Sequence, residues 1–282
     1  MGSTDHATPV VESLFSLLTS LRWDPILKKH PDCVYGAPFY LLGHHRERLL
    51  NAARWFNERG TYLQGVGKWG SAIAWLEDVE GFERDIVGGI RSCGVDVEGP
   101  LRVRITLPAR SSTSPEFTIT AVSTPSVPLL TLFPESLSPL PDSEEPPCTP
   151  TSSWTLHIDT LPTLPTSLTS HKTTARRHYD ISRERCALPP LGSAGANNEV
   201  VMYNPDGDVM EGTFTTLYFW RKEEGGWITP CLEAGGCEAT VRRWLLERGV
   251  VKEGGIKVEE VRRGEWVVMS NAVRGVWGGW VV

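Results

Sequence analysis

The chain has 282 residues, of which 40% are hydrophobic and 22% charged, as in an ordinary globular protein with a sizeable core. Its formal net charge of −6 gives no overall attraction for nucleic acid or an anionic membrane, so we expect neither as a partner. No apolar run reaches the length of a membrane-spanning helix, and the acidic start lacks the basic region of a signal peptide. We therefore expect a cytoplasmic protein.

Six cysteines are scattered along the chain, at positions 33, 93, 148, 186, 231 and 237. A chain of this length does not need disulfide bonds to hold its fold. Cys231 and Cys237 are six residues apart and have no histidine nearby, which is a poor pattern for zinc. We expect free thiols in a reducing compartment and no bound metal.

The first part of the chain mixes helix and strand patterns. Residues 10–23 carry apolar side chains at helical or mixed spacing and belong to the fold. Residues 43–60 have apolar side chains at helical spacing, and residues 72–94 predict one helix or two short ones. Residues 101–109 and 116–122 alternate in polarity, so they predict two strands that form a hairpin.

A segment rich in proline, serine and threonine extends from about Ser123 to Ser170. Proline fixes φ and lacks an amide donor, so this segment predicts an irregular connection with one short strand at 154–161. We therefore place domain boundaries on either side of it. The predicted units are an N-terminal α/β domain (1–122), an interdomain connection with an insertion (123–165) and a C-terminal cofactor-binding domain (166–282).

The last part of the chain is denser in regular elements. The patterns first predict a helix over 169–185, opened by a lysine, and a hairpin over 198–220 that turns at "NPDG". A short strand over 225–230 and a helix over 238–249 that ends at Gly249 follow. The chain then forms a strand, a turn and a final apolar stretch over 266–282.

The order of these motifs resembles the fold-type IV pyridoxal-phosphate (PLP) enzymes, the class IV aminotransferase family. The segments "HKTTARRHYD" (171–180) and "SNAVRG" (270–275) are most similar to its aminodeoxychorismate lyase branch, and "HHRERL" (44–49) contains the family's H-x-x-R-L pattern. The resemblance implies an α/β (α+β, two-domain) fold like that of D-amino-acid aminotransferase. It also implies a cofactor at the domain interface and a homodimer whose partner helps to close the site.

The resemblance implies roles for five residues toward the cofactor. Lys172 would form the Schiff base, because the chemistry needs an amine that can also move protons. Glu211 would face the pyridine nitrogen, which draws electrons best when it is protonated. Arg48, Thr240 at a helix start, and Asn271 would bind the phosphate.

Other residues are candidates for the substrate. The resemblance implies that Arg176 and Tyr179 line or brace the site. A substrate with two carboxylates needs converging cations, for which Arg104 and Arg274 are the candidates and Arg110 a further one.

Simpler interpretations stand beside these roles. A lysine in a basic segment is usually a solvated charge, and a glutamate after a turn is usually exposed. The adjacent pair His44 and His45 could suggest a metal, but neighbouring helical residues point apart, so packing or capping explains them better.

The chain departs from the family pattern near the expected phosphate. Glu238 and Ala239 replace the usual Pro-Gly, and Thr216 replaces an asparagine. A glutamate beside a phosphate is unfavourable unless it points away. This departure is the one support for a non-catalytic homologue.

The lyase is the favoured activity, because two motifs are specific to that branch. It would eliminate pyruvate from 4-amino-4-deoxychorismate and yield 4-aminobenzoate for folate synthesis. The first alternative is a class IV aminotransferase acting on D-amino acids, branched-chain amino acids or R-amines, and the second is the non-catalytic homologue.

Overall fold

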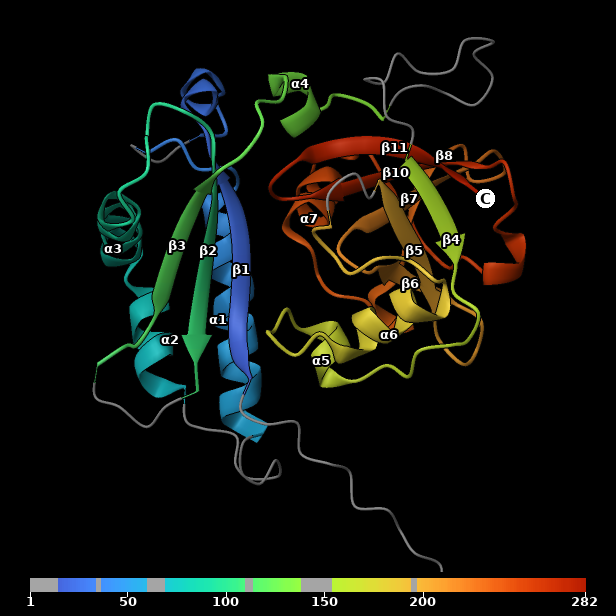
Figure 1. Ribbon diagram of the computed structural model, residues 1–282, viewed down its shortest axis with the longest axis horizontal. Coiled ribbons are helices and arrows are strands. Elements are labelled where there is room, and N and C mark those ends of the chain that lie inside the picture. The colour runs from blue at the N-terminus through green and yellow to red at the C-terminus, as the bar shows by residue number, and fades with distance from the viewer. Residues whose placement is uncertain (1–14, 34–36, 60–68, 110–113, 138–153, 194–196) are drawn as a thin grey trace, which may run out of the picture.

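The computed structural model describes residues 15–33, 37–59, 69–109, 114–137, 154–193 and 197–282. Figure 1 shows two halves side by side, each built on its own sheet. The short helix α4 (Leu129–Leu132) and the segment that joins α5 (Ser167–Ser170) to α6 (Arg177–Arg185) lie where the halves meet. No helix in the described ranges is long and apolar enough to cross a membrane.

The smaller half has a three-stranded antiparallel sheet in the order β1 (Ser16–Trp23), β2 (Leu101–Pro108), β3 (Thr118–Ser123). Along β2, alternate residues are fully buried and the arginines between them, Arg102 and Arg104, are exposed. This is the period of a strand with one face on a core. The predicted hairpin of residues 101–109 and 116–122 is confirmed.

Residues 16–23 form strand β1, although their apolar spacing looks helical or mixed. Both faces of this strand are largely buried, so its pattern does not alternate. The inner face packs on the core of the smaller half, and the outer face turns toward the larger half. Pairing with β2, which is distant in sequence, decides this conformation.

Three helices cover one face of the small sheet: α1 (Leu42–Arg59), α2 (Gly70–Glu77) and α3 (Val79–Ser92). The predicted region 72–94 is therefore two helices. Asp78 separates them, because its extended backbone ends α2 and its side chain accepts a hydrogen bond from the Gly81 amide at the start of α3 (3.0 Å).

The larger half has an eight-stranded mixed sheet that curls until β6 approaches β7 and β8. Its strands in spatial order are β6 (Val209–Gly212), β5 (Asn198–Tyr203), β4 (Trp154–Ile158), β11 (Gly275–Val281), β10 (Trp266–Asn271), β7 (Thr216–Arg221), β8 (Gly226–Pro230) and β9 (Lys252–Gly254). β4 is parallel to both of its neighbours, and it ties the predicted connection to this sheet. The boundaries at 122 and 165 stay predictions.

The predicted hairpin of 198–220 is divided in two. β5 and β6 pair across a turn at Asn204, whose side chain accepts from the amides of Asp206 and Asp208 (3.0 and 2.9 Å). After Gly212 the chain turns and β7 begins at Thr216, where it pairs with β10 and β8 and forms no strand pairing with β6. The turn between β6 and β7 therefore crosses one end of the curled sheet.

Lys172 does not open a helix, which corrects the prediction for residues 169–185. α6 begins only at Arg177, and residues 172–174 are extended along β1. The Leu18 amide donates to the Lys172 carbonyl (3.0 Å), and the Thr174 amide donates to the Ser16 carbonyl (2.9 Å). These bonds to the other half hold the lysine segment out of the helical conformation.

The end of the chain follows the predicted order. α7 (Thr240–Glu247) is followed by Gly249 at φ +67°, where glycine is favoured. β10 and β11 pair across the "SNAVRG" turn, and a Cβ on Gly275 would lie 2.3 Å from the carbonyl oxygen of Thr131 in α4. Three short 3₁₀ helices complete the described elements: η1 (Pro25–Lys29), η2 (Leu232–Ala234) and η3 (Val258–Glu260).

Candidate active site

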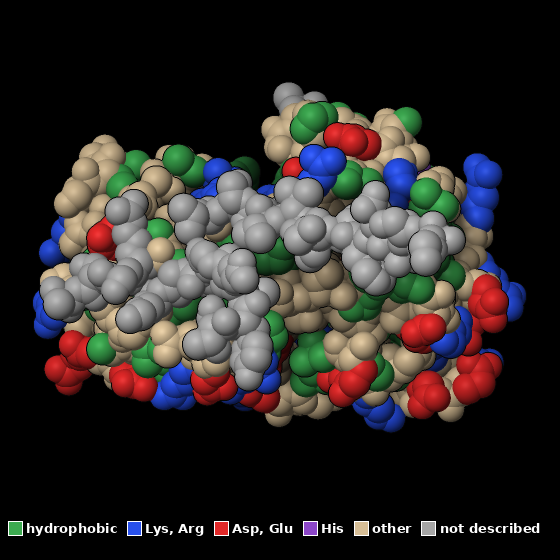
Figure 2. All heavy atoms as spheres, turned by 90° about the horizontal axis from the view of Figure 1, so that it is seen from below, with side chains coloured by type: hydrophobic (Ala, Val, Ile, Leu, Met, Phe, Trp, Pro, Cys, Tyr) green, Lys and Arg blue, Asp and Glu red, His purple; other side chains and the backbone are tan. Residues whose placement is uncertain are grey.

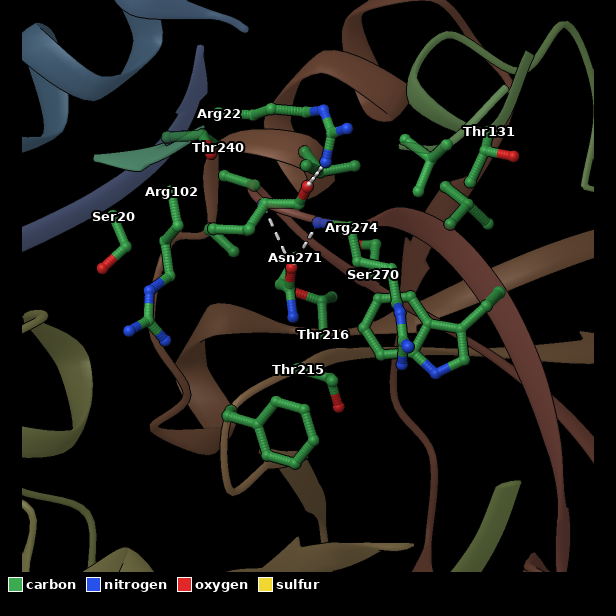
Figure 3. Close-up of a pocket in the computed structure, with 18 of the residues that line it drawn as sticks. Ser20, Arg22, Arg102, Thr131, Thr215, Thr216, Thr240, Ser270, Asn271 and Arg274 are labelled. Carbon is green, nitrogen blue, oxygen red and sulfur yellow. Dashed lines mark hydrogen bonds between the residues drawn. The ribbon is translucent and has the colours of Figure 1, made fainter. Parts of the chain in front are cut away.

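A cavity of about 1500 Å³ lies between the two halves. The outward face of the small sheet, the lysine segment, the linker after β3, the β6–β7 turn, the start of α7 and the β10–β11 turn line it. Figure 3 shows Arg102 and Ser20 from the small sheet facing Asn271, Thr216 and Thr215 from the large half.

The cavity concentrates positive charge. Seven cationic side chains line it against two acidic ones; the cations are Arg22, Arg48, Arg102, Arg104, Lys172, Arg176 and Arg274, and the acids are Glu135 and Asp180. The whole chain carries −6, and on the face seen in Figure 2 side chains of both signs are intermingled. The cavity is therefore suited to an anionic ligand.

Lys172 lines the cavity from the segment that is bonded to β1. Burial, followed by the positive charge of Arg48, lowers the pKa of its amine to about 8, although Cys237 and Glu211 act in the opposite direction. More of the amine is therefore neutral near pH 8 than for an ordinary lysine, and the neutral form is the one that attacks a carbonyl carbon.

Glu211, on β6, lies behind the cavity wall with only 9% of its surface exposed. It accepts a hydrogen bond from the Tyr179 hydroxyl (2.6 Å) and another from the Cys237 amide. Burial raises its pKa to about 7, against the effects of Tyr179 and Lys172. Such a carboxyl group can pair with a protonated ring nitrogen.

Tyr179 and Arg176 connect α6 to this carboxylate. Burial and the Glu211 charge raise the pKa of Tyr179 well above its ordinary value, so the phenol keeps the proton that it donates. The Arg176 guanidinium lies over the Tyr179 ring (4.9 Å to the centroid) and donates to the Thr213 carbonyl (3.0 Å). Arg176 lines the cavity, whereas Tyr179 braces Glu211 from behind.

Arg48 and the start of α7 form a second subsite. The Arg48 guanidinium donates to Thr19 Oγ1 (2.7 Å), while its buried Nε has no hydrogen-bond partner among the described residues. Thr240 is buried at the first turn of α7, where backbone amides lack helical acceptors. An unpaired guanidinium nitrogen and free helix amides fit the phosphate of PLP.

The departures from the family pattern leave this subsite open to a phosphate. Ala239 and Thr216 line the cavity, but Glu238 is not among its lining residues. The Glu238 charge acts on Arg48, whose pKa it raises, although burial lowers that pKa overall. The glutamate therefore supports the arginine without occupying the cavity.

Asn271 has a structural task in the "SNAVRG" turn. Its side-chain oxygen accepts from the amides of Val273 and Arg274 (3.0 and 2.9 Å), as Figure 3 shows. Asn271 also lines the cavity near Thr216. Its contact with the phosphate stays a prediction.

The candidate substrate arginines lie on different walls. Arg104 extends from the exposed face of β2, and Arg274 lies over the rings of Trp154 and Trp277 (4.9 and 5.2 Å to the centroids). Arg110 lies outside the described residues.

Sequence reasoning missed several residues of the site. Arg102 lines the cavity beside Arg104, and the period of β2 could have revealed it. Arg22 is 1% exposed and donates to the Val273 and Pro125 carbonyls (3.0 and 2.8 Å), so it joins the small sheet to the "SNAVRG" turn. No local pattern indicates these long-range bonds.

The loop before α7 passes close to Glu211. We expect Gly236→Ala to disrupt the packing of this loop against β6. A Cβ on Gly236 would lie 2.7 Å from the Met210 carbonyl oxygen, which cannot move without moving β6. We predict a loss of about 1–3 kcal/mol of stability, seen as a melting temperature several degrees lower. Gly255→Ala is the matched control, because no atom lies within 4 Å of its added Cβ. Equal melting temperatures for the two variants would contradict this packing.

Comparison with known proteins shows which family this chain resembles in sequence. A family model described as amino-transferase class IV matches residues 33–279. An aminodeoxychorismate lyase of Saccharomyces cerevisiae is 32% identical over 135 residues, which cover 44% of this chain and 36% of the yeast protein. The chain thus matches little more than a third of that relative's length.

Solved structures share the fold over nearly the whole chain. A 4-amino-4-deoxychorismate lyase of Pseudomonas aeruginosa has a TM-score of 0.57 at 18% identity and covers 94% of this chain and 82% of its own. The branched-chain aminotransferase of Escherichia coli has a TM-score of 0.57 at 13% identity, with 95% and 76% covered. At these identities the structures establish the fold alone, and the predicted fold-type IV architecture is confirmed. The family model spans most of the chain, which therefore belongs to the class IV aminotransferase family.

Proposed function

We propose that the protein is a PLP-dependent 4-amino-4-deoxychorismate lyase, which releases pyruvate and forms 4-aminobenzoate for folate synthesis. The observation that carries the proposal is the cavity itself. Its walls carry a lysine with a lowered pKa and arginines on opposed sides, and the buried carboxyl group of Glu211 lies directly behind one wall. The lyase-like motifs and the partial match to the yeast lyase support the same reaction.

The class IV aminotransferase family depends on PLP, and the residues fit that cofactor. Lys172 would bind its aldehyde carbon, Glu211 would face its ring nitrogen, and Arg48 with Thr240 would hold its phosphate. When bound, the cofactor withdraws electrons from the substrate carbon that bears the amino group.

The substrate amine would displace Lys172 from that aldehyde carbon, and the freed lysine would then act as the acid and base of the elimination. Its neutral amine takes the proton from the ring carbon that carries the substrate nitrogen. The C–O bond to the enolpyruvyl group breaks, and the electron pair leaves with that group. The same amine returns a proton to the leaving group's methylene carbon, which makes pyruvate. The ring becomes aromatic as 4-aminobenzoate, so no oxidant is needed.

The two substrate carboxylates need two separate cationic anchors. Arg104 on β2 and Arg274 on the β10–β11 turn project into the cavity from different halves of the protein. An aminotransferase for apolar amino acids would need one carboxylate clamp and an apolar slot. We therefore favour the lyase.

Loss of either arginine should weaken the substrate complex. We predict that Arg104→Leu and Arg274→Leu each lower kcat/KM about 10- to 100-fold, mostly through KM, since each removes a charged hydrogen bond. Steady-state release of pyruvate, coupled to lactate dehydrogenase, measures both constants. Arg91→Leu, on the exposed face of α3, is the control and should behave as wild type. An unchanged KM in both cavity variants would contradict the proposal that Arg104 and Arg274 bind the two carboxylates.

The same assay distinguishes the alternative activities. Amino-group transfer from D-alanine, leucine or an R-amine to a keto acid, without pyruvate release from aminodeoxychorismate, would show an aminotransferase. A protein that acquires no cofactor absorption band with PLP would be the non-catalytic homologue.

We also propose that the protein is a homodimer. Val122, Leu130 and Leu191 line the cavity mouth and are 46%, 72% and 42% exposed. A second copy would cover this apolar rim and exclude water from the site. Sedimentation velocity should give twice the 31.2 kDa mass of the chain, and a monomer would contradict this proposal.

A further inference from the structure

We infer that His45 is a positioning residue that directs the hydroxyl proton of Thr240 into the phosphate subsite. This inference rests on the proposed cofactor. It assigns a role to a histidine that does not line the cavity and that reaches the phosphate subsite only through its contacts with Thr19 and Thr240.

A chain of four polar side chains crosses from one half of the protein to the other. Arg48 Nη2 donates to Thr19 Oγ1 (2.7 Å), and Thr19 Oγ1 lies 2.6 Å from His45 Nδ1. His45 Nε2 lies 3.5 Å from Thr240 Oγ1 at the start of α7. Both Thr19 and His45 are 0% exposed, so these contacts are closed to bulk solvent.

The direction of each hydrogen bond follows from the guanidinium at one end. Arginine only donates, so Thr19 Oγ1 accepts from Arg48. If His45 Nδ1 also donated to it, the proton of the fully buried Thr19 hydroxyl would have no acceptor among the described residues, which is costly. Thr19 therefore donates to Nδ1, and the ring proton of neutral His45 is on Nε2.

His45 remains neutral in this surrounding. Burial, with the nearby charges of Arg48 and Lys172, holds its pKa well below the ordinary value. A neutral imidazole has one N–H, and here it is the Nε2–H that faces Thr240.

This arrangement fixes what Thr240 offers to a ligand. Its oxygen accepts from His45, so its own proton is free to point into the cavity, which Thr240 lines. The ligand it fits is an acceptor-only dianion such as a phosphate monoester, which Arg48 contacts from the other side. The opposite tautomer would use the Thr240 proton on the ring and leave an oxygen lone pair toward the phosphate.

The adjacent histidine provides an internal comparison. His44 also joins α1 to α7, through a contact of 2.9 Å with Glu247, but it does not line the cavity or contact Arg48 or Thr240. A variant of His44 therefore reports the effect of losing a contact between these two helices alone.

The test compares the binding of PLP with that of pyridoxal, which lacks the phosphate, to the cofactor-free protein. We expect His45→Leu to weaken PLP binding about 10- to 100-fold and to leave pyridoxal binding unchanged, since only phosphate contacts are lost. His45→Gln, whose side-chain amide can donate to Thr240, should recover most of the PLP affinity. His44→Leu should leave both affinities at the wild-type value.

A measurement on the wild type avoids any dependence on folding of the variants. In ¹⁵N NMR spectra of the imidazole, the inference requires a protonated Nε2 and an unprotonated Nδ1. The opposite tautomer would overturn it, as would equal losses of PLP and pyridoxal affinity in His45→Leu. Those results leave the proposed function intact if the wild type binds PLP. A wild type that binds no PLP would overturn the proposed function together with this inference.

Discussion

Replacing Lys172 with alanine is expected to abolish formation of 4-aminobenzoate, with a loss of at least about 10³-fold in kcat. The variant lacks both the amine that binds the cofactor aldehyde and the group that moves the proton. The cofactor absorption band that depends on the lysine should also disappear. Product fluorescence and the absorption spectrum measure the two effects independently.

The control is Arg177→Ala, which removes an exposed charge from the same basic segment. We expect it to retain wild-type activity. A Lys172→Ala variant that kept more than about a tenth of the activity would contradict the role of the lysine as the acid and base.

Loss of the lysine should stabilise the cofactor-free protein. The pKa of Lys172 is about 8 in the folded protein and 10.5 ordinarily, so the unfolded chain binds the proton more tightly. The free-energy cost of burying the charged amine is fully present below pH 8, falls as the pH rises from 8 to 10.5, and is absent above 10.5. Lys172→Met should therefore exceed the wild type in free energy of unfolding at pH 7, and denaturant titrations should show a smaller difference at pH 10. A difference that grows with pH would contradict the assigned direction.

Glu211→Gln is expected to lower kcat by about 10²- to 10³-fold, because an amide cannot keep a proton on the ring nitrogen of the cofactor. The amide oxygen can still accept the hydrogen bond of Tyr179, so the fold should persist. Single-turnover kinetics with saturating PLP separate this effect from weaker cofactor binding.

The control for this variant is Glu233→Gln, which changes an exposed acid on η2, in the loop before α7. It removes the same charge without a contact to Tyr179 and should retain full activity. Equal rates for Glu211→Gln and wild type would show that the buried carboxyl group does not act on the ring nitrogen.

Local patterns predicted much of the fold. The alternation of β2, the "NPDG" turn and Gly249 after α7 all report interactions within a few residues. β1 and the lysine segment could not be predicted in this way, because β1 takes its extended form from pairing with β2 and the lysine segment takes its own from β1, across the two halves. Pairing between residues 17 and 173 leaves no trace in either segment alone.

In the candidate site, too, local motifs could be recognised from the sequence, whereas long-range contacts could not. Resemblance to a family indicated Lys172, Glu211 and Arg48, because their motifs are contiguous in the sequence. The hydrogen bond from Tyr179 to Glu211 and the hydrogen bond from Arg22 to the Val273 carbonyl depend on tertiary contacts. These contacts explain how the residues are held, which the motifs do not express.

A direct assay of product formation decides whether the protein is a lyase. The purified protein, loaded with PLP, is mixed with enzymatically prepared 4-amino-4-deoxychorismate, and the fluorescence of 4-aminobenzoate is followed beside the Lys172→Ala variant. The lyase account predicts 4-aminobenzoate and pyruvate in equal amounts from the wild type and neither from the variant. A wild type that shows the cofactor absorption band but forms no 4-aminobenzoate would contradict it.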